Sequence, residues 1–184
     1  GIAHFAARGL GTLYEAMGDA IVEKYFSPEA STVSELKQKT AVGSQRDGWC
    51  RKGSKKAVRG TCWHMRWWRR GMEDFLISPE SKEIQFQAWK QLTVEPADKL
   101  MDNWGDNKNE AWHTRRARSI GYSLVNSGGP GLLIKFAKNG FRDPNETMEA
   151  YNRDKGRVRT RFRVLNKLYP DVAFKPTFDP GAYG

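Results

Sequence analysis

The sequence is poor in the residues that bind metals and close disulfides. It contains two cysteines and three histidines in 184 residues. The histidines are scattered, and two cysteines without a matching histidine pair do not make a zinc site. Walker, Rossmann, HExxH and GxSxG sequences are missing too. These absences argue against nucleotide chemistry, zinc proteolysis and α/β-hydrolase chemistry, and we expect no metal and no cofactor.

The sequence also lacks a long apolar run. Nothing approaches the roughly 20 apolar residues needed to cross a bilayer, so we expect no membrane span. The N-terminus does not have the basic, apolar and small-residue order of a signal peptide. It begins Gly1-Ile-Ala without an initiator methionine. We therefore expect a domain excised from a larger protein, whose targeting signals lie elsewhere.

Negative charge is scarce relative to positive charge. The chain has 31 Lys and Arg against 21 Asp and Glu, which gives a net charge of +10 and a pI near 9.7. A field of this sign concentrates negative polymers around the protein. The charge predicts a polyanionic partner, which could be nucleic acid, an anionic membrane surface or the bacterial envelope.

The remaining composition is that of a folded, helical protein. Hydrophobic residues make up 39% and aromatic residues 12% of the chain, and its length suits a single domain over residues 1–184. Apolar residues recur at three- and four-residue spacing, which predicts a mainly α fold. The first helical region starts near Leu10 and ends before Ser27-Pro28. Gly18 weakens it, or ends a first helix and starts a second.

The segment 40–62 is different, with four glycines and little helical period. We read it as a small β-hairpin or an irregular basic loop. Cys50 and Cys62 flank its basic part, and they are either paired or two buried free thiols. Pairing would stabilise the fold by about 3 kcal/mol in the chain-entropy model and would indicate an oxidising compartment such as the periplasm.

Helix boundaries are predicted at several places beyond residue 63. Ser78-Pro79-Glu80 is typical of a cap, a first-turn proline and a first-turn acid, and the stretch 126–131, NSGGPG, is typical of a helix stop. Asp143-Pro144 predicts another start. In the helix before the stop, the residues expected to face inward are Trp112, Ala117, Ile120, Leu124 and Val125.

Tryptophan and arginine supply two candidate binding surfaces. Seven tryptophans are present, and we expect most of them in the core, with exposed rings available to stack on sugars or bases. The helix RVRTRFRVLNK, residues 157–167, could follow a phosphate backbone, although such a face is more often simply solvated. No recognised nucleic-acid-binding motif accompanies it.

Glycan hydrolysis needs a carboxylic acid that stays protonated near neutral pH and usually a second carboxylate across the bond. The early carboxylates recur four residues apart, which on one unbroken helix makes an ordinary solvated stripe. They become a site only if the helix ends near Gly18 and turns Glu15 toward partly apolar walls that raise its pKa. The candidates are Glu15, Asp19, Glu23, Glu29 and Asp47.

From Trp68 onward the chain resembles family 46 chitosanases and the lysozyme-like muramidases of phages and type VI secretion effectors. The resemblance is carried by WRRGMED from Trp68, by Phe86-Gln87, by Glu95-Pro96-Ala97, by the helix within 115–131 that reads RARSIGYSLVNSGGPG, and by MEAYNRD from Met148. It implies a lysozyme-like domain of two helical lobes around a cleft, with a small β-hairpin.

The resemblance also implies functional residues. Those families place the catalytic Glu at the end of the first long helix, and Tyr14-Glu15 best fits that order. The signature that normally follows is missing, and we favour Asp47 over Asp19 and Glu23 as the second carboxylate. The residues expected to contact substrate are Trp63, Trp67, Tyr122 and Asn126.

The function expected from the sequence is therefore that of a peptidoglycan-degrading muramidase, which would act as an antibacterial effector delivered to the periplasm and be countered by an immunity protein. Chitosan is a poorer substrate because it is cationic, like the protein. Two alternatives remain at this point. One is a basic nucleic-acid-binding module, and the other is a wall-binding domain that does not cut.

Overall fold

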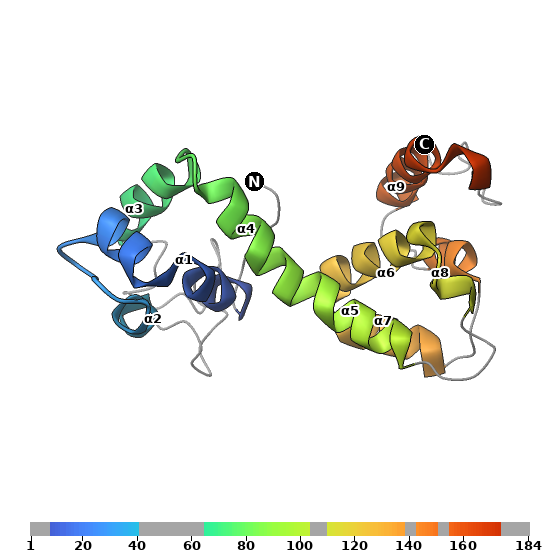
Figure 1. Ribbon diagram of the computed structural model, residues 1–184, viewed down its shortest axis with the longest axis horizontal. Coiled ribbons are helices and arrows are strands. Elements are labelled where there is room, and N and C mark those ends of the chain that lie inside the picture. Colours follow the sequence, from blue (N-terminus) through green and yellow to red (C-terminus); the bar gives the residue numbers. More distant parts are fainter. Residues whose placement is uncertain (1–7, 41–64, 104–109, 139–142, 151–154, 174–184) are drawn as a thin grey trace. The chain divides into compact units, whose positions relative to one another are not determined.

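The computed structural model describes residues 8–40, 65–103, 110–138, 143–150 and 155–173. All regular structure in these ranges is helical and none is strand, which confirms the prediction of a mainly α fold (Figure 1). The segment predicted as a hairpin, with Cys50 and Cys62, lies outside the described residues. None of the described helices is long and apolar enough to cross a membrane. The chain divides into two compact units, Gly1–Leu92 and Thr93–Gly184.

In the first unit, one long helix contacts three others (Figure 1). Helix α1 (Arg8–Phe26) contacts α2 (Val33–Thr40), α3 (Arg66–Leu76) and α4 (Ser81–Trp89). The apolar positions that repeat along α1 are buried against these helices, as the spacing predicts. The buried core side chains include Leu10, Leu13, Tyr14, Met17, Val22, Phe26, Leu36, Trp68, Met72 and Phe75.

A hydrogen bond between aromatic side chains joins α1 to α3 inside this core. The hydroxyl of Tyr14 is fully buried and accepts a hydrogen bond of 2.6 Å from Nε1 of Trp68. Burial raises the pKa of Tyr14 to about 12, so the hydroxyl is un-ionised at neutral pH. Tyr14 therefore belongs to the core, and its neighbour Glu15 points to the opposite side, where it is exposed.

Gly18 divides α1 into two helical segments. Its backbone has φ 69° and ψ 168°, a conformation outside the helical region and accessible essentially only to glycine. The interpretation in which a first helix ends at Gly18 and a second one runs to Phe26 therefore describes this region correctly. The kink changes the direction of the chain between Glu15 and Asp19.

We expect the substitution Gly18→Ala to destabilise the protein by about 1–3 kcal/mol, because a side chain strains a backbone at positive φ. No atom lies within 4 Å of the position of the added Cβ, so the cost is conformational and not steric. Urea denaturation followed by circular dichroism measures it. Unchanged stability would show that residue 18 can adopt helical angles and that the kink is not required.

The second unit is built around α6 (Arg115–Gly128). Helix α6 contacts α5 (Glu95–Asp102), α7 (Pro130–Lys138) and α8 (Pro144–Ala150) (Figure 1). The remaining elements are the π-helical turn η3 (Lys90–Val94), in which the division between the units falls, the short helices η4 (Glu110–Trp112) and η5 (Pro170–Val172), and α9 (Lys155–Leu168).

The predicted features of α6 and its neighbours are confirmed. The residues expected to face inward are all buried, and they are Trp112, Ala117, Ile120, Leu124 and Val125. Gly129 has φ 73° and separates α6 from α7. Asp143 caps α8, because its Oδ1 accepts hydrogen bonds from the amides of Asn145 at 2.8 Å and Glu146 at 3.4 Å.

The helix start predicted with Ser78 as its cap is wrong by two residues. Helix α4 begins at Ser81, and the Ser78 hydroxyl is buried without a hydrogen-bond partner, so it caps nothing. Glu80 is not a first-turn acid, because its carboxylate bonds to Lys24 and Tyr25 of α1 instead. A tertiary contact has replaced the local capping pattern here.

Candidate functional site

A groove of about 720 Å³ opens at the C-terminal end of α1, entirely within the first unit. One wall is the last turn of α1 and the residues after it, and the other is a face of α3. The lining residues are Lys24, Tyr25, Phe26, Ser27, Pro28 and Glu29 on the first wall, and Arg66, Trp67, Arg70, Gly71 and Asp74 on the second.

A close approach between α1 and α3 forms the floor of the groove. A Cβ on Gly71 would lie 2.6 Å from the carbonyl oxygen of Tyr25 and 2.6 Å from Cδ1 of Phe26, so only glycine fits. Beside this contact, Trp67 packs edge to face on Phe26, with ring centroids 6.4 Å apart. Trp67 is partly buried and also lines the groove. Its ring is thus held by packing and still available to a ligand.

Glu80 neutralises one of the cations of the groove. Its Oε1 accepts hydrogen bonds of 2.6 Å from Nζ of Lys24 and 2.6 Å from the hydroxyl of Tyr25. The hydrogen bond from Lys24 and then the one from Tyr25 lower the pKa of Glu80 to about 2, and Glu80 raises the pKa of Lys24. Lys24 is therefore already paired, and its side chain is tied to the start of α4.

This pair predicts a stability difference that depends on pH. The folded pKa of Glu80 lies near 2, below the usual value of 4.5, so its stabilisation is fully present above pH 4.5 and is lost as the pH falls toward 2. We expect Glu80→Gln to be less stable than the parent at pH 6, with the difference shrinking below pH 4. Urea denaturation at several pH values checks this. A difference that does not vary with pH would contradict the ion pair.

Four other charged side chains line the groove without an ion pair. Arg66, Arg70 and Asp74 follow at four-residue spacing along α3, and Glu29 lies on the opposite wall. Among the residues that the structure describes, no oppositely charged group lies within 4.0 Å of any of them. The groove thus presents two guanidinium groups, two carboxylates and one indole ring to a ligand.

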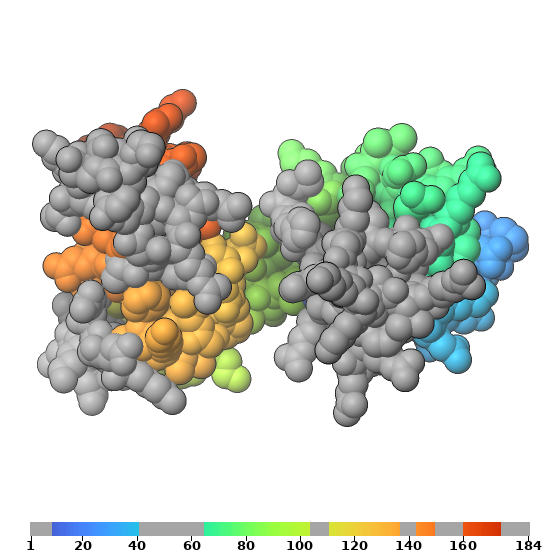
Figure 2. Space-filling model, turned by 180° about the vertical axis from the view of Figure 1, so that it is seen from behind, coloured from blue at the N-terminus to red at the C-terminus, as the bar shows by residue number. Residues whose placement is uncertain are grey.

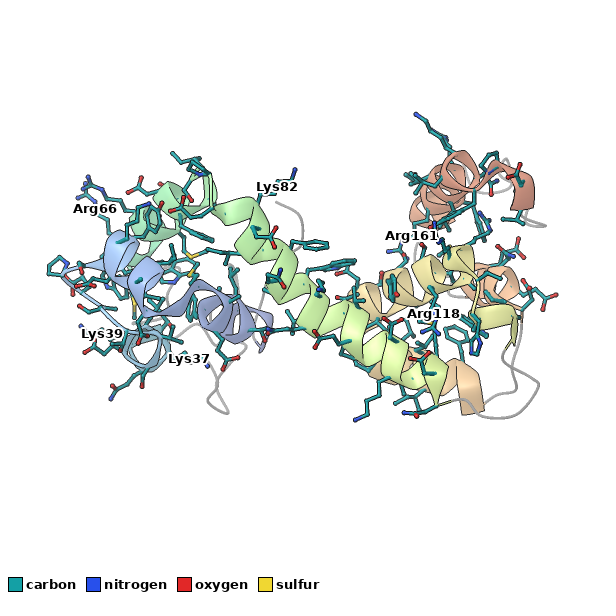
Figure 3. All side chains as sticks on the ribbon, viewed as in Figure 1. Lys37, Lys39, Arg66, Lys82, Arg118 and Arg161 are labelled. Carbon is teal, nitrogen blue, oxygen red and sulfur yellow. The ribbon has the colours of Figure 1, made fainter. Side chains whose placement is uncertain are left out.

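The backbone of Glu29 is fixed at this position. Its amide donates a hydrogen bond of 2.9 Å to the carbonyl of Phe26, and its carbonyl accepts one from Nζ of Lys39, which Figure 3 labels. Its carboxylate is exposed to solvent on the groove. Glu29 therefore has a fixed backbone and an exposed carboxylate just after the first long helix.

The three acids expected on α1 do not meet in the groove. Glu15 forms an ion pair with Lys37 of α2, and its side chain is 58% exposed, so it lacks the partly apolar surroundings that the sequence argument required. Asp19 accepts a hydrogen bond of 2.8 Å from the amide of Val33 and so caps α2. Glu23 is exposed on the surface of α1.

The expected substrate-binding residues have separate locations. Trp67 lines the groove, while Tyr122 and Asn126 belong to the second unit. The hydroxyl of Tyr122 donates a hydrogen bond of 2.8 Å to Asp98, and burial together with this bond raises its pKa to about 12. Asn126 is exposed near the end of α6. Asp47 and Trp63 lie outside the described residues.

Asp98 also belongs to a structural network in the second unit. Arg118 bridges α6 to α5 by donating to Asp98 at 2.8 Å and to Asp102 (Figure 3). Tyr122 shares the same acceptor, Oδ1 of Asp98. These contacts tie two helices together, so the hydroxyl of Tyr122 already has a structural partner.

The sequence argument did not combine Glu29 with Asp74, Arg66 and Arg70. A usable signal was present for Glu29, because the Ser27-Pro28 break correctly predicts where α1 ends. The resemblance implies a catalytic Glu at the end of the first long helix. If that helix is taken to end at Phe26 and not at Gly18, the next Glu in the sequence is Glu29. No sequence signal brings Asp74 to the same groove, since that depends on how α3 crosses α1.

Comparison with known proteins does not add to this description, because no family model, curated protein or solved structure matches the chain. Within the described residues, no three potential metal ligands of the His, Cys, Asp or Glu type are grouped together. The groove and the sequence are therefore the features of the protein that bear on its function.

Proposed function

We propose that this protein is a muramidase that hydrolyses the glycan of bacterial peptidoglycan in the groove at the end of α1. The observation that carries the proposal is that two carboxylates and a tryptophan line one groove beside the end of the first long helix. The resemblance to lysozyme-like muramidases and family 46 chitosanases, with its two-lobed fold, supports the same conclusion.

The proposed chemistry uses Glu29 as the proton donor and Asp74 as the second carboxylate. Hydrolysis of a glycosidic bond needs one carboxylic acid to protonate the leaving oxygen and one carboxylate to activate water or to stabilise the oxocarbenium-like charge. Both side chains are exposed in the free protein. A glycan filling the groove would displace water from Glu29 and favour its protonated form.

Trp67 is proposed as the platform on which a sugar ring stacks. Aromatic faces pack well against the apolar faces of sugars, and the ring is held in place by its edge-to-face contact with Phe26. In the space-filling view of Figure 2, the end of α1 (blue) lies beside α3 (blue-green). A residue fixed by packing gives the reproducible geometry that bond cleavage requires.

Charge favours peptidoglycan among the possible glycans. The net charge of +10 attracts a wall polymer that carries carboxylates and repels cationic chitosan. Acting from the periplasmic side, such a domain would damage the cell wall of a bacterium. From the resemblance to type VI effector muramidases, we propose that it is a secreted antibacterial effector with an immunity protein as the partner in the producing cell.

The arginine-rich helix α9 gives no specific support to the nucleic-acid alternative. Arg161 donates a hydrogen bond of 2.5 Å to the hydroxyl of Ser127 on α6 and is only partly exposed (Figure 3). Arg163 and Lys167 are exposed and could attract any polyanion. Because one arginine of α9 already bonds within the protein, the helix is weaker evidence for a phosphate-binding face.

Release of reducing ends from purified sacculi tests the proposal. We expect the parent protein to release them and mass spectrometry to show products cut at the glycan and not at the peptide. Glu15→Gln should retain the activity of the parent, because Glu15 is outside the groove and paired with Lys37. A parent that releases no reducing ends would exclude the hydrolase, and an inactive Glu15→Gln would exclude the groove as the site.

A further inference from the structure

We propose that Arg66 and Arg70 form a subsite for a carboxylate borne by the sugar polymer in the groove, namely a free carboxylate of a peptide stem. This inference rests on the proposal that a wall glycan occupies the groove. It adds what the groove recognises besides the sugar ring, and therefore why a wall glycan with acidic stems binds better than a neutral glycan of the same backbone.

The two guanidinium groups are suited to this task by position. They are four residues apart on α3, so they are neighbours on one helix face, and both line the groove. Each guanidinium offers five N–H donors in a planar fork that matches the two oxygens of a carboxylate. Figure 3 labels Arg66 on α3. Neither side chain is buried, so a ligand can reach both.

These arginines differ from Lys24 and Lys37 of the first unit in having no ion pair with the described residues. Lys24 is paired with Glu80 and Lys37 with Glu15. Arg66 and Arg70, in contrast, have no acidic group of the described residues within 4.0 Å. Their donors are thus available for charge-assisted hydrogen bonds with a ligand, which are the stronger kind.

The other charges of the groove indicate how the ligand's negative charges are spaced. Glu29 and Asp74 line the same groove, so a polymer with a phosphate on every unit would place some of its charge against a carboxylate. A glycan whose carboxylates are separated by neutral sugars avoids this repulsion. Trp67 and Arg66 both line the groove, so the groove offers an indole ring as well as a guanidinium, as a sugar with an acidic substituent requires.

The test measures binding of Arg66→Gln/Arg70→Gln to uncut sacculi from which phosphate polymers have been removed. Both this variant and the controls carry Glu29→Gln, so the glycan stays intact. We expect the affinity for sacculi to fall about tenfold or more, because the variant loses charge-assisted hydrogen bonds. The matched control is Arg69→Gln/Lys82→Gln, which removes the same charge from exposed residues of α3 and α4 that do not line the groove.

Two further ligands identify the group that is recognised. Sacculi whose carboxylates have been amidated should bind the Glu29→Gln protein as weakly as intact sacculi bind the variant that also lacks the two arginines, and the double arginine substitution should then cost nothing more. A neutral chitin oligosaccharide should bind both proteins equally. An equal loss in the control, or an equal loss on amidated sacculi, would overturn the assignment. So would a single-stranded oligonucleotide that competes better than intact sacculi.

The failure of this inference is distinguishable from the failure of the proposed function. Reducing-end release by the parent reports on hydrolysis, and sacculus binding reports on the arginines. A chain that binds through stem carboxylates without cutting keeps the arginine subsite and excludes the hydrolase. A chain that cuts sacculi and binds them equally with and without Arg66 and Arg70 keeps the hydrolase and excludes the arginine subsite.

Discussion

Replacing Glu29 with Gln should lower the rate of reducing-end release from sacculi by about 10²–10⁴-fold, the contribution expected of a general acid. Gln has nearly the same size but no proton to give to the glycosidic oxygen. Because the exposed Glu29 side chain makes no ion pair with the described residues, the substitution should not affect folding. We expect kcat to fall while KM stays close to that of the parent, since only the transition state loses a contact.

The control for this prediction is Glu15→Gln, the same chemical change at a carboxylate outside the groove. Both variants should show the circular dichroism spectrum of the parent, and Glu15→Gln should lose only the small stabilisation of its exposed ion pair with Lys37. Asp74→Asn should lower kcat as Glu29→Gln does, because hydrolysis needs both carboxylates. Full activity of Glu29→Gln, together with loss in Glu15→Gln, would move the proton donor back to α1 and refute the groove as the active site.

The second large effect is expected from Gly71→Ala, which should destabilise the first unit by about 3 kcal/mol, at the upper end of overpacking costs. The added Cβ would lie 2.6 Å from a backbone carbonyl oxygen, that of Tyr25, and as close to the ring of Phe26. A flexible side chain could move away, but the carbonyl moves only if α1 separates from α3. Thermal and urea denaturation measure the loss.

Gly131→Ala is the matched control for this substitution. Gly131 lies in α7, and no atom is within 4 Å of the Cβ that alanine would add. Alanine in an open helical position stabilises by about 0.5–1 kcal/mol relative to glycine. The two Gly→Ala changes should therefore shift stability in opposite directions. If Gly71→Ala were also neutral or stabilising, the close contact between α1 and α3 would not exist.

Local sequence determined several of the helix boundaries. Ser27-Pro28 ends α1, Gly129 separates α6 from α7, and Asp143 starts α8, as predicted. These signals are readable because each one acts within a few residues, through a fixed proline φ, a positive glycine φ or a side chain that bonds to a nearby amide. Helical periodicity likewise identified the buried face of α6.

The tertiary structure alone decided which of the acids share a groove. Glu15 forms an ion pair with Lys37 of α2, and Asp19 accepts a hydrogen bond from the amide of Val33. Glu29 instead lies across the groove from Asp74, because Gly71 lets α3 approach the end of α1. Residues 27–65 separate α1 from α3 in the sequence, so no periodicity or spacing encodes their approach. A helix contact depends on packing between distant residues, and for this reason the grouping of charged side chains could be learned only from the folded protein.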